Sequence, residues 1–173
     1  MSECKPTSTT LVPKEQLAIA TQDKIEKLNL LKVSYRSAIG NINYLSMATR
    51  PDLSFAVSSL SQYLENPAIK HWHDFLHVLH YLKGSSKIGL RYKKDGAQGI
   101  SAWSDVYWGN CCSTRRSVTG YLAAFNNILV LWKTRKKPVV LISSAEAEYK
   151  ALCDLTSELL LLKNGALRQE YYN

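Results

Sequence analysis

The spacing of apolar residues changes once along the chain, close to Gly84, and this change limits the folds that the sequence can adopt. Before Gly84 the apolar residues recur every three or four positions, which is typical of helices buried on one side. After Gly84 they alternate with polar residues, which is typical of strands. A helical part therefore precedes a part that contains a sheet, and the expected fold class is α/β in the broad sense, more strictly α+β.

Three helices are expected before the change of period. Pro51 suits the first turn of a helix, and Gly84 suits the residue that ends one. The residues before Tyr35 are rich in Ser, Thr, Pro and Lys, which favours an extended lead-in over residues 1–34. The helices are expected from Tyr35 to a break at Thr49–Asp52, from that break to about Leu64, and from His71 to Lys83, the last with an apolar face of Trp72, Phe75, Leu76, Leu79 and Leu82.

The second part is expected to form a mixed sheet with one helix on one face. Asn126 and Asn127 separate two of its apolar runs and predict a tight hairpin turn. The strand segments and apolar runs are residues 88–92, 100–106, 118–125, 128–133 and 139–142.

A helix is expected to begin just after the last of these runs. Ser143 and Glu146 have the spacing of a capping box, in which each side chain accepts a hydrogen bond from the backbone near the other. At helical spacing Glu148 shares a face with Leu152, Leu155 and Leu159, so its carboxylate is expected to point toward the core. A carboxylate in apolar surroundings requires a cation, a metal ion or a raised pKa.

Asp105, at the end of a predicted strand, is the candidate carboxylate opposite Glu148. Two acids held together repel each other unless divalent metal lies between them, and two metal ions ~4 Å apart are the usual device for cleaving phosphodiesters. The alternative is structural: Asp105 caps a turn, and Glu148 pairs with Arg115 or Arg116. The spacing leaves both interpretations open.

Charge and composition indicate the kind of partner. Lysine and arginine exceed aspartate and glutamate by eight, and the pI is about 9.3, which favours nucleic acid over a membrane. No apolar run has transmembrane length, and the first residues lack the pattern of a signal peptide, so an intracellular, non-secreted protein is expected. Cys4, Cys111, Cys112 and Cys153 lack zinc-ligand spacing and are expected to be reduced thiols.

Three groups of side chains are candidates for binding. His73, His77 and His80 share the polar face of the third helix. Their spacing allows a zinc pair, but no third type of ligand is nearby, so a solvated face is favoured. A basic run follows Trp132 and could contact phosphates or form a solvated loop; it comprises Lys133, Arg135, Lys136 and Lys137. Aromatic residues near Asp105 could stack on bases or pack at a rim; they are Trp103, Tyr107 and Trp108.

Several motifs, in unbroken order, are similar to one family. In the first part they are Cys4–Thr9, Tyr35–Gly40, Thr49–Asp52 and Leu79–Gly84. In the second they are Ser104–Asp105, Arg115–Tyr121, Trp132–Lys137 and Ser143–Tyr149. Together they resemble the Pol polyproteins of copia-type LTR retrotransposons, where the end of the reverse transcriptase is followed by an RNase H domain.

The resemblance implies domains, an activity and a site. Residues 35–94 would be the helical, thumb-like or connection-like end of a reverse transcriptase, and 99–173 a truncated RNase H-like domain. That domain would cut the RNA strand of RNA–DNA hybrids with Mg²⁺ or Mn²⁺, and Asp105 and Glu148 would be catalytic as its first two metal-binding acids. Contacts to the nucleic acid would come from His77, His80, Arg115, Arg116, Lys133, Arg135, Lys136 and Lys137.

The chain also departs from the family pattern. Tyr107 stands where a further acid is usual, and the strand that would carry the third metal-binding acid is not in the sequence. An incomplete metal set is therefore expected, in a module that is inactive alone; the alternative is a non-catalytic nucleic-acid-binding relic. The missing strand would leave the edge of residues 100–106 open, which invites self-association or contact with the rest of a polyprotein.

Overall fold

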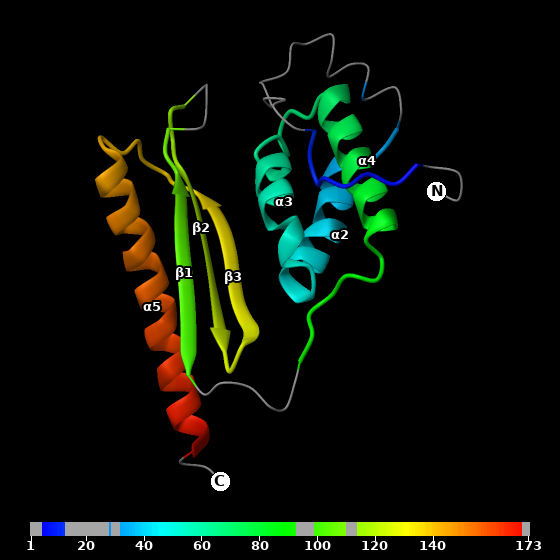
Figure 1. Ribbon diagram of the computed structural model, residues 1–173. Coiled ribbons are helices and arrows are strands. Elements are labelled where there is room, and N and C mark those ends of the chain that lie inside the picture. Colours follow the sequence, from blue (N-terminus) through cyan, green and yellow to red (C-terminus); the bar gives the residue numbers. More distant parts are fainter. Residues whose placement is uncertain (1–4, 13–27, 29–31, 93–98, 110–113, 171–173) are drawn as a thin grey trace. The chain divides into compact units, whose positions relative to one another are not determined.

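The computed structural model describes residues 5–12, 28, 32–92, 99–109 and 114–170, apart from the side chains of 165–170. The chain forms two units, Met1–Leu90 and Arg91–Asn173. The first is helical and the second combines a sheet with one helix, so the α+β class is confirmed (Figure 1). The expected extended lead-in lies mostly outside the described residues; within them, 5–12 form neither helix nor strand.

The helical unit contains the three predicted helices with shifted boundaries. They are α2 (Tyr35–Ala48), α3 (Ser54–Ser61), which follows the short 3₁₀ helix η1 (Pro51–Leu53), and α4 (Ile69–Gly84). The hydroxyl of Ser34 caps α2 by accepting a hydrogen bond from the Ser37 N–H. α4 begins two residues before the predicted start, because the ring of His71 accepts a hydrogen bond from the Ala68 N–H at 3.0 Å.

The core of this unit lies between the three helices. Tyr35 is buried, and its hydroxyl donates to the Leu60 carbonyl at 3.0 Å, which joins α2 to α3. Burial raises the pKa of Tyr35, as does the charge of Asp74. The predicted apolar face of α4 does pack against this core, although only Phe75 of that face is fully buried. The buried members are Leu28, Tyr35, Ile39, Ile42, Leu53, Ala56, Val57, Leu60, Phe75 and Val78.

A buried arginine connects the start of η1 to the end of α4. The Arg50 guanidinium donates to both carboxylate oxygens of Asp52, at 2.7 to 3.2 Å, and to the carbonyl and hydroxyl of Ser85. Tyr81 donates to the same carboxylate at 2.7 Å. Burial would raise the pKa of Asp52, but the hydrogen bonds from Arg50 and Tyr81 outweigh it and hold the pKa below its usual value.

The predicted strand at residues 88–92 is wrong. This segment has no strand structure, and Ile88 and Tyr92 are exposed. The Ile88 N–H instead bonds to the Ser85 carbonyl in a turn. Alternation predicts a strand only where another strand can pair with it, and no described strand lies beside this segment.

Within the described residues the sheet of the second unit has three strands, in the order β1-β2-β3. They are β1 (Ile100–Tyr107), β2 (Val118–Phe125) and β3 (Ile128–Lys136). Both pairings are antiparallel, so the expectation of a mixed sheet is wrong for the described strands. The hairpin turn at Asn126 and Asn127 is confirmed, with φ of 50° and 62°. The apolar run at 139–142 forms no strand, and only Leu141 of it is buried.

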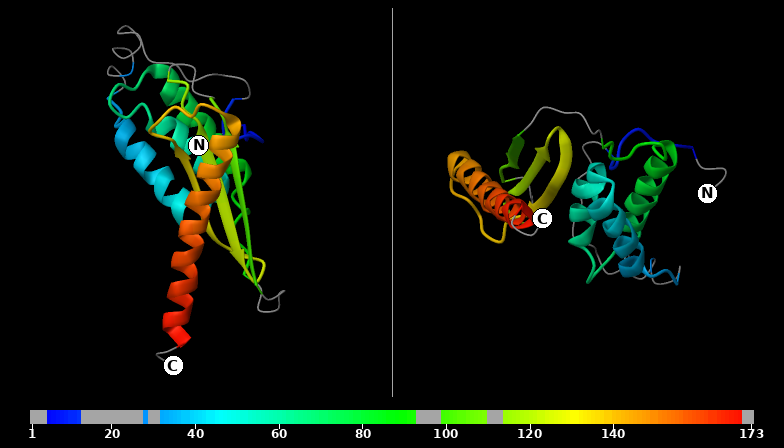
Figure 2. Two further views of the ribbon diagram at one scale, coloured as in Figure 1. Left: turned by 90° about the vertical axis from the view of Figure 1, so that its left-hand side faces the viewer. Right: turned by 90° about the horizontal axis from the view of Figure 1, so that it is seen from below.

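A single long helix, α5 (Ser144–Glu170), covers one face of this sheet (Figure 2). The Ser143 hydroxyl accepts from the Glu146 N–H at 3.1 Å, so the predicted cap is present. The Glu146 carboxylate reaches back to the Ile142 N–H, one residue earlier than in a standard capping box. Ala147 and Ala151 are fully buried, and their small side chains allow α5 to lie close to the strands.

Candidate functional site

The two faces of the sheet determine where the candidate acids lie. Residues that pair across antiparallel strands point to the same face, and neighbours along a strand point to opposite faces. Ser104 pairs with Tyr121, whose hydroxyl donates to Glu158 of α5 at 3.0 Å, so this face is the one beneath α5. Asp105, the next residue, pairs with Gly120 and points to the other, open face.

Asp105 makes a local hydrogen bond on that open face. Its carboxylate accepts from the N–H of Val106 at 2.8 Å, and the side chain is exposed. The Asn126 N–H bonds to the carbonyl of Gly99, which precedes β1. Hydrogen-bonded positions alternate along an antiparallel strand, so the odd-numbered residues of β1 direct their amides to β2. Val106 is even-numbered and directs its amide outward. Asp105 therefore covers an amide of the sheet edge, a structural role close to the predicted turn cap.

The expectation that Glu148 points toward the core is wrong. Its side chain is exposed, and the buried line of α5 passes through Ala147, Ala151 and Leu155. At 100° per residue, Glu148 lies about 60° from Ala151 around the helix, at the margin of the buried face. An exposed carboxylate needs no partner to offset burial, and among the described residues no ion pair joins Glu148 to Arg115 or Arg116.

The two candidate acids lie on opposite sides of the sheet. Asp105 lies on the open face of the sheet, while α5, with Glu148, covers the other face. No group of three or more His, Cys, Asp or Glu side chains within the described ranges could hold a metal ion. A site for Mg²⁺ or Mn²⁺ at Asp105 and Glu148 stays a prediction, and the placement of the two acids on opposite sides of the sheet argues against it.

The predicted basic run is divided between two environments. Lys133 donates to Glu158 at 3.2 Å, and Lys137 is buried and donates to Asp154, so both lysines pair with acids of α5. Hydrogen bonds from Tyr121 and Lys133 lower the pKa of Glu158. Arg135 is exposed, whereas Lys136 is partly buried. The run is thus not a single row along phosphates; two of its members join the helix to the sheet.

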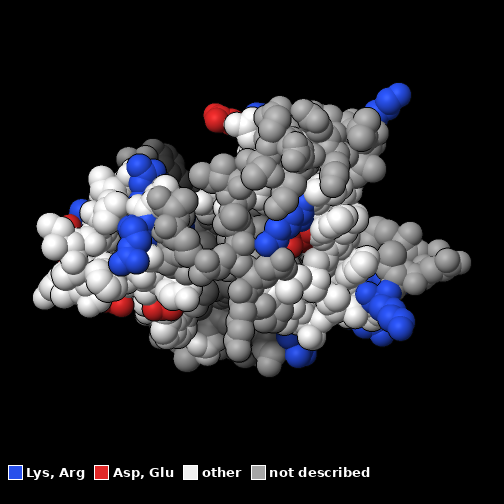
Figure 3. Space-filling view, turned by 90° about the horizontal axis from the view of Figure 1, so that it is seen from above, with Lys and Arg blue, Asp and Glu red and all other residues white. Residues whose placement is uncertain are grey.

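Arg115 and Arg116 lie in the connection between β1 and β2, and both are exposed. Arg115 has φ of 53°, an uncommon conformation for a residue with a side chain. Figure 3 shows the described lysine and arginine side chains of one face in small, separate groups.

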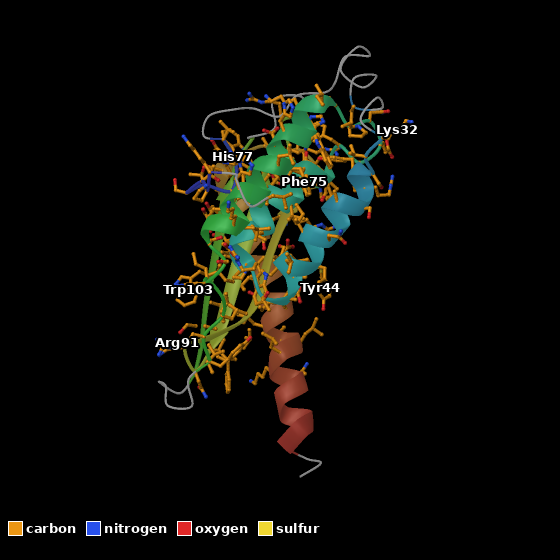
Figure 4. The ribbon with its side chains drawn as sticks, turned by 90° about the vertical axis from the view of Figure 1, so that its right-hand side faces the viewer. Lys32, Tyr44, Phe75, His77, Arg91 and Trp103 are labelled. Atoms are coloured by element: carbon orange, nitrogen blue, oxygen red, sulfur yellow. The ribbon has the colours of Figure 1, made fainter. Side chains whose placement is uncertain are left out.

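The histidines of α4 lie beside the N-terminal segment. The ring of His77 is 3.3 Å from the Thr9 hydroxyl, and the carbonyl of His80 accepts a hydrogen bond from the Thr7 N–H (Figure 4). His73 is exposed. The helical periodicity gave no sign that residues 5–12 would lie along this face, and these contacts leave His77 and His80 only partly exposed.

The aromatic residues near Asp105 lie in two environments, the open face of the sheet and its rim. Trp103 and Tyr107 share the open face with Asp105 and are 55% and 61% exposed. Trp108 donates its indole N–H to the Leu141 carbonyl at 3.2 Å, so it packs at the rim of the sheet.

Comparison with known proteins decides the family. The Pol polyprotein from transposon RE2 of Arabidopsis thaliana is 33% identical over 159 residues, which is 92% of this chain. The Pol polyprotein from transposon TNT 1-94 of Nicotiana tabacum is 34% identical over 179 residues, or 99% of this chain. The chain belongs to the copia-type retrotransposon Pol polyproteins. The resemblance seen in the sequence is therefore confirmed.

The chain spans only 11% of the RE2 polyprotein and 13% of the TNT 1-94 polyprotein. A different relative, named secreted RxLR effector protein 161, from Plasmopara viticola, is 40% identical over 130 residues, which is 75% of this chain and 92% of that protein. No protein-family model and no solved structure matches the chain. The described helices include none long and apolar enough to cross a membrane.

Three of the motifs on which the sequence resemblance rests meet one another in the helical unit. Arg50 and Asp52, from one motif, bond to Tyr81 and to the residue after Gly84, the end of another. A Cβ added to Gly84 would lie 2.8 Å from the Cβ of Pro6, which belongs to a third motif. Sequence reasoning missed this network because a buried arginine has no periodic signature.

Proposed function

We propose that this retrotransposon-derived chain binds nucleic acid through exposed cations and does not cleave it. The observation that carries the proposal is the separation of the two candidate acids. Asp105 is on the open face and bonded to an edge amide, while Glu148 is on the helix across the sheet. Cleavage by two metal ions requires carboxylates that converge on both ions.

Residues 99–173 are proposed to derive from an RNase H-type module, and residues 35–94 from the end of a reverse transcriptase. The order of the shared motifs and the long helix after the three strands support this origin. In intact form the module would hydrolyse the RNA strand of RNA–DNA hybrids. In this chain the described acids do not fit the metal ions, so we assign it no hydrolytic step.

Nucleic-acid binding rests on three exposed arginines. Arg115, Arg116 and Arg135 are exposed, and no described acidic side chain pairs with them. The overall excess of eight positive charges adds a longer-range attraction for polyanions. Lys133 and Lys137 contribute less, because each already pairs with an acid of α5.

Titration of a labelled RNA–DNA hybrid at several salt concentrations tests the binding. If the three arginines contact phosphates, the affinity falls about 40-fold between 50 and 200 mM salt, from a slope of roughly −0.9 per contact. Replacing Arg115, Arg116 and Arg135 together by Gln is expected to weaken binding and flatten the slope. The matched control is Lys137→Gln, which removes one buried positive charge and should leave the slope unchanged. An affinity independent of salt would contradict a phosphate-contact mode.

A cleavage assay separates the proposal from a nuclease. The purified chain, incubated with hybrid and Mg²⁺ or Mn²⁺, is expected to give no more than trace cleavage, and Asp105→Asn is expected to change nothing. Robust cleavage that disappears in Asp105→Asn would show that the acids converge on metal in solution. An intracellular location stays a prediction; since one relative is named a secreted protein, fractionation of cells and medium is its direct test.

A further inference from the structure

The outer edge of β1 carries backbone groups that no described strand pairs. Since the odd-numbered residues of β1 bond to β2, four even-numbered residues direct their amides and carbonyls outward. The Asp105 carboxylate occupies the amide of Val106. The outward set is Ile100, Ala102, Ser104 and Val106.

The two edges of the sheet differ in charge. β3 carries Lys133, Arg135 and Lys136, so two β3 edges would repel each other. β1 carries a single charged side chain, that of Asp105. Of the two edges, β1 is therefore the one suited to pair with an identical strand.

The flank of α5 beside this edge is also uncovered. Asp154 and Glu158 bond to lysines at and just after β3, so the opposite flank of the helix lies toward the β1 edge. Leu152 on that flank is 51% exposed. Four residues of the flank fall within about 60° of arc at 100° per residue. In chain order they are Glu148, Leu152, Leu159 and Lys163.

These four residues form a stripe whose charges complement those of an identical stripe running in the opposite direction. An antiparallel copy places Glu148 beside Lys163 at both ends and leucines together in the middle. Glu158, which is close to the middle of the stripe along the axis of α5, bonds to Tyr121, and Tyr121 pairs with Ser104 near the middle of β1. The middle of the stripe therefore lies level with the middle of the strand. One twofold axis can therefore serve both the strand and the helix.

We propose that the partner of this surface is a second copy of the chain, with the two β1 strands antiparallel about Trp103. In this register Ala102 pairs with Ser104 of the second copy and Ile100 with Val106. The Val106 amide exchanges the Asp105 carboxylate for the Ile100 carbonyl of the second copy, so all four outward residues are paired. Asp105 faces Ser101, and no like charges meet. The contact is closed by its symmetry, which gives a dimer with a continuous six-stranded sheet.

Disulfide trapping tests the register. Trp103→Cys in the full chain, with the four native cysteines replaced by Ser, places two thiols directly opposite at a non-hydrogen-bonded position. The Cα–Cα separation there is about 4.5 Å, within the range of disulfides. The matched control is Leu122→Cys, on the same open face but one strand inward. We expect a covalent dimer for position 103 and none for 122; equal trapping, or none at either position, would overturn the register.

Charge exchange on α5 tests the helix contact without altering the sheet. Sedimentation of the full chain, freed of nucleic acid, is expected to show a dimer whose dissociation constant rises about tenfold in Glu148→Lys, through two like-charge contacts. The double variant Glu148→Lys with Lys163→Glu is expected to restore wild-type affinity. A monomeric wild type, a ladder of larger oligomers from β1-to-β3 pairing, or a double variant as weak as the single one would each refute the proposed dimer.

Discussion

Replacing Arg50 by Met should destabilise the helical unit more than any other single change to an arginine of this unit. The guanidinium is buried and joins Asp52 to the carbonyl and hydroxyl of Ser85. Its removal leaves the Asp52 carboxylate with Tyr81 and a local backbone amide as donors, and leaves the Ser85 carbonyl without the hydrogen bond from the arginine. Breaking a buried ion pair costs about 3 to 5 kcal/mol; since the Asp52 side chain is 26% exposed, we expect about 3 kcal/mol.

Thermal and urea unfolding followed by circular dichroism measure this loss. For a unit of this size each kcal/mol lowers the melting temperature by about 4 to 8 °C, so a fall of at least about 12 °C is expected. Arg36→Met is the matched control, because Arg36 lies exposed on α2 and its loss should cost less than about 0.5 kcal/mol. A loss below about 1 kcal/mol in Arg50→Met would refute the reasoning that this network is buried and cooperative.

Two further predictions concern the same unit. The pKa of the Asp52 carboxyl is lower in the folded state than its ordinary value of 3.8. The ionised carboxylate therefore stabilises the fold above pH 3.8, and this stabilisation is lost as the pH falls through the folded pKa. Acid titration should destabilise the wild type in this range more than it destabilises Arg50→Met. Gly84→Ala should displace the N-terminal segment, because the new Cβ would meet the Cβ of Pro6. The chemical shifts of Thr7 should report this displacement. The control is Gly40→Ala, whose new Cβ meets nothing within 4 Å and which should stabilise α2. Unchanged shifts in Gly84→Ala would show that the segment does not pack there.

The helices could be predicted because each has its own periodic signal. The apolar positions of α2 and α4 recur at helical spacing whatever they pack against, so the elements were found and only their ends moved. The start of α4 was missed because its cap is the ring of His71, which accepts the Ala68 N–H in place of a hydroxyl or carboxylate. Sequence rules for capping consider the usual residue types and not the geometry of an imidazole.

The strands were harder, because a strand exists only when it has a partner. Residues 88–92 and 139–142 have the apolar content of strands, yet nothing described lies beside them to pair with. β2 and β3 were predictable because Asn126 and Asn127 bring two such runs together by a local turn. The remaining pairings depend on distant parts of the chain, which local patterns do not encode.

The candidate acids show how much depends on one residue of register. Trp103 and Tyr107 are the largest apolar residues of β1, and their size favours burial beneath the helix, with Asp105 between them on the same face. The structure turns them away: the helix-facing residues of β1 are Ile100, Ala102, Ser104 and Val106, and α5 buries Ala147 and Ala151. The aromatic rings of β1 thus lie on the open face, and Tyr121 of β2 is the aromatic residue beneath α5 whose hydroxyl bonds to Glu158. Asp105 follows them by alternation, so a shift of β1 by one residue would turn it toward the face that α5 covers, and the register of this strand decides how the two acids are placed.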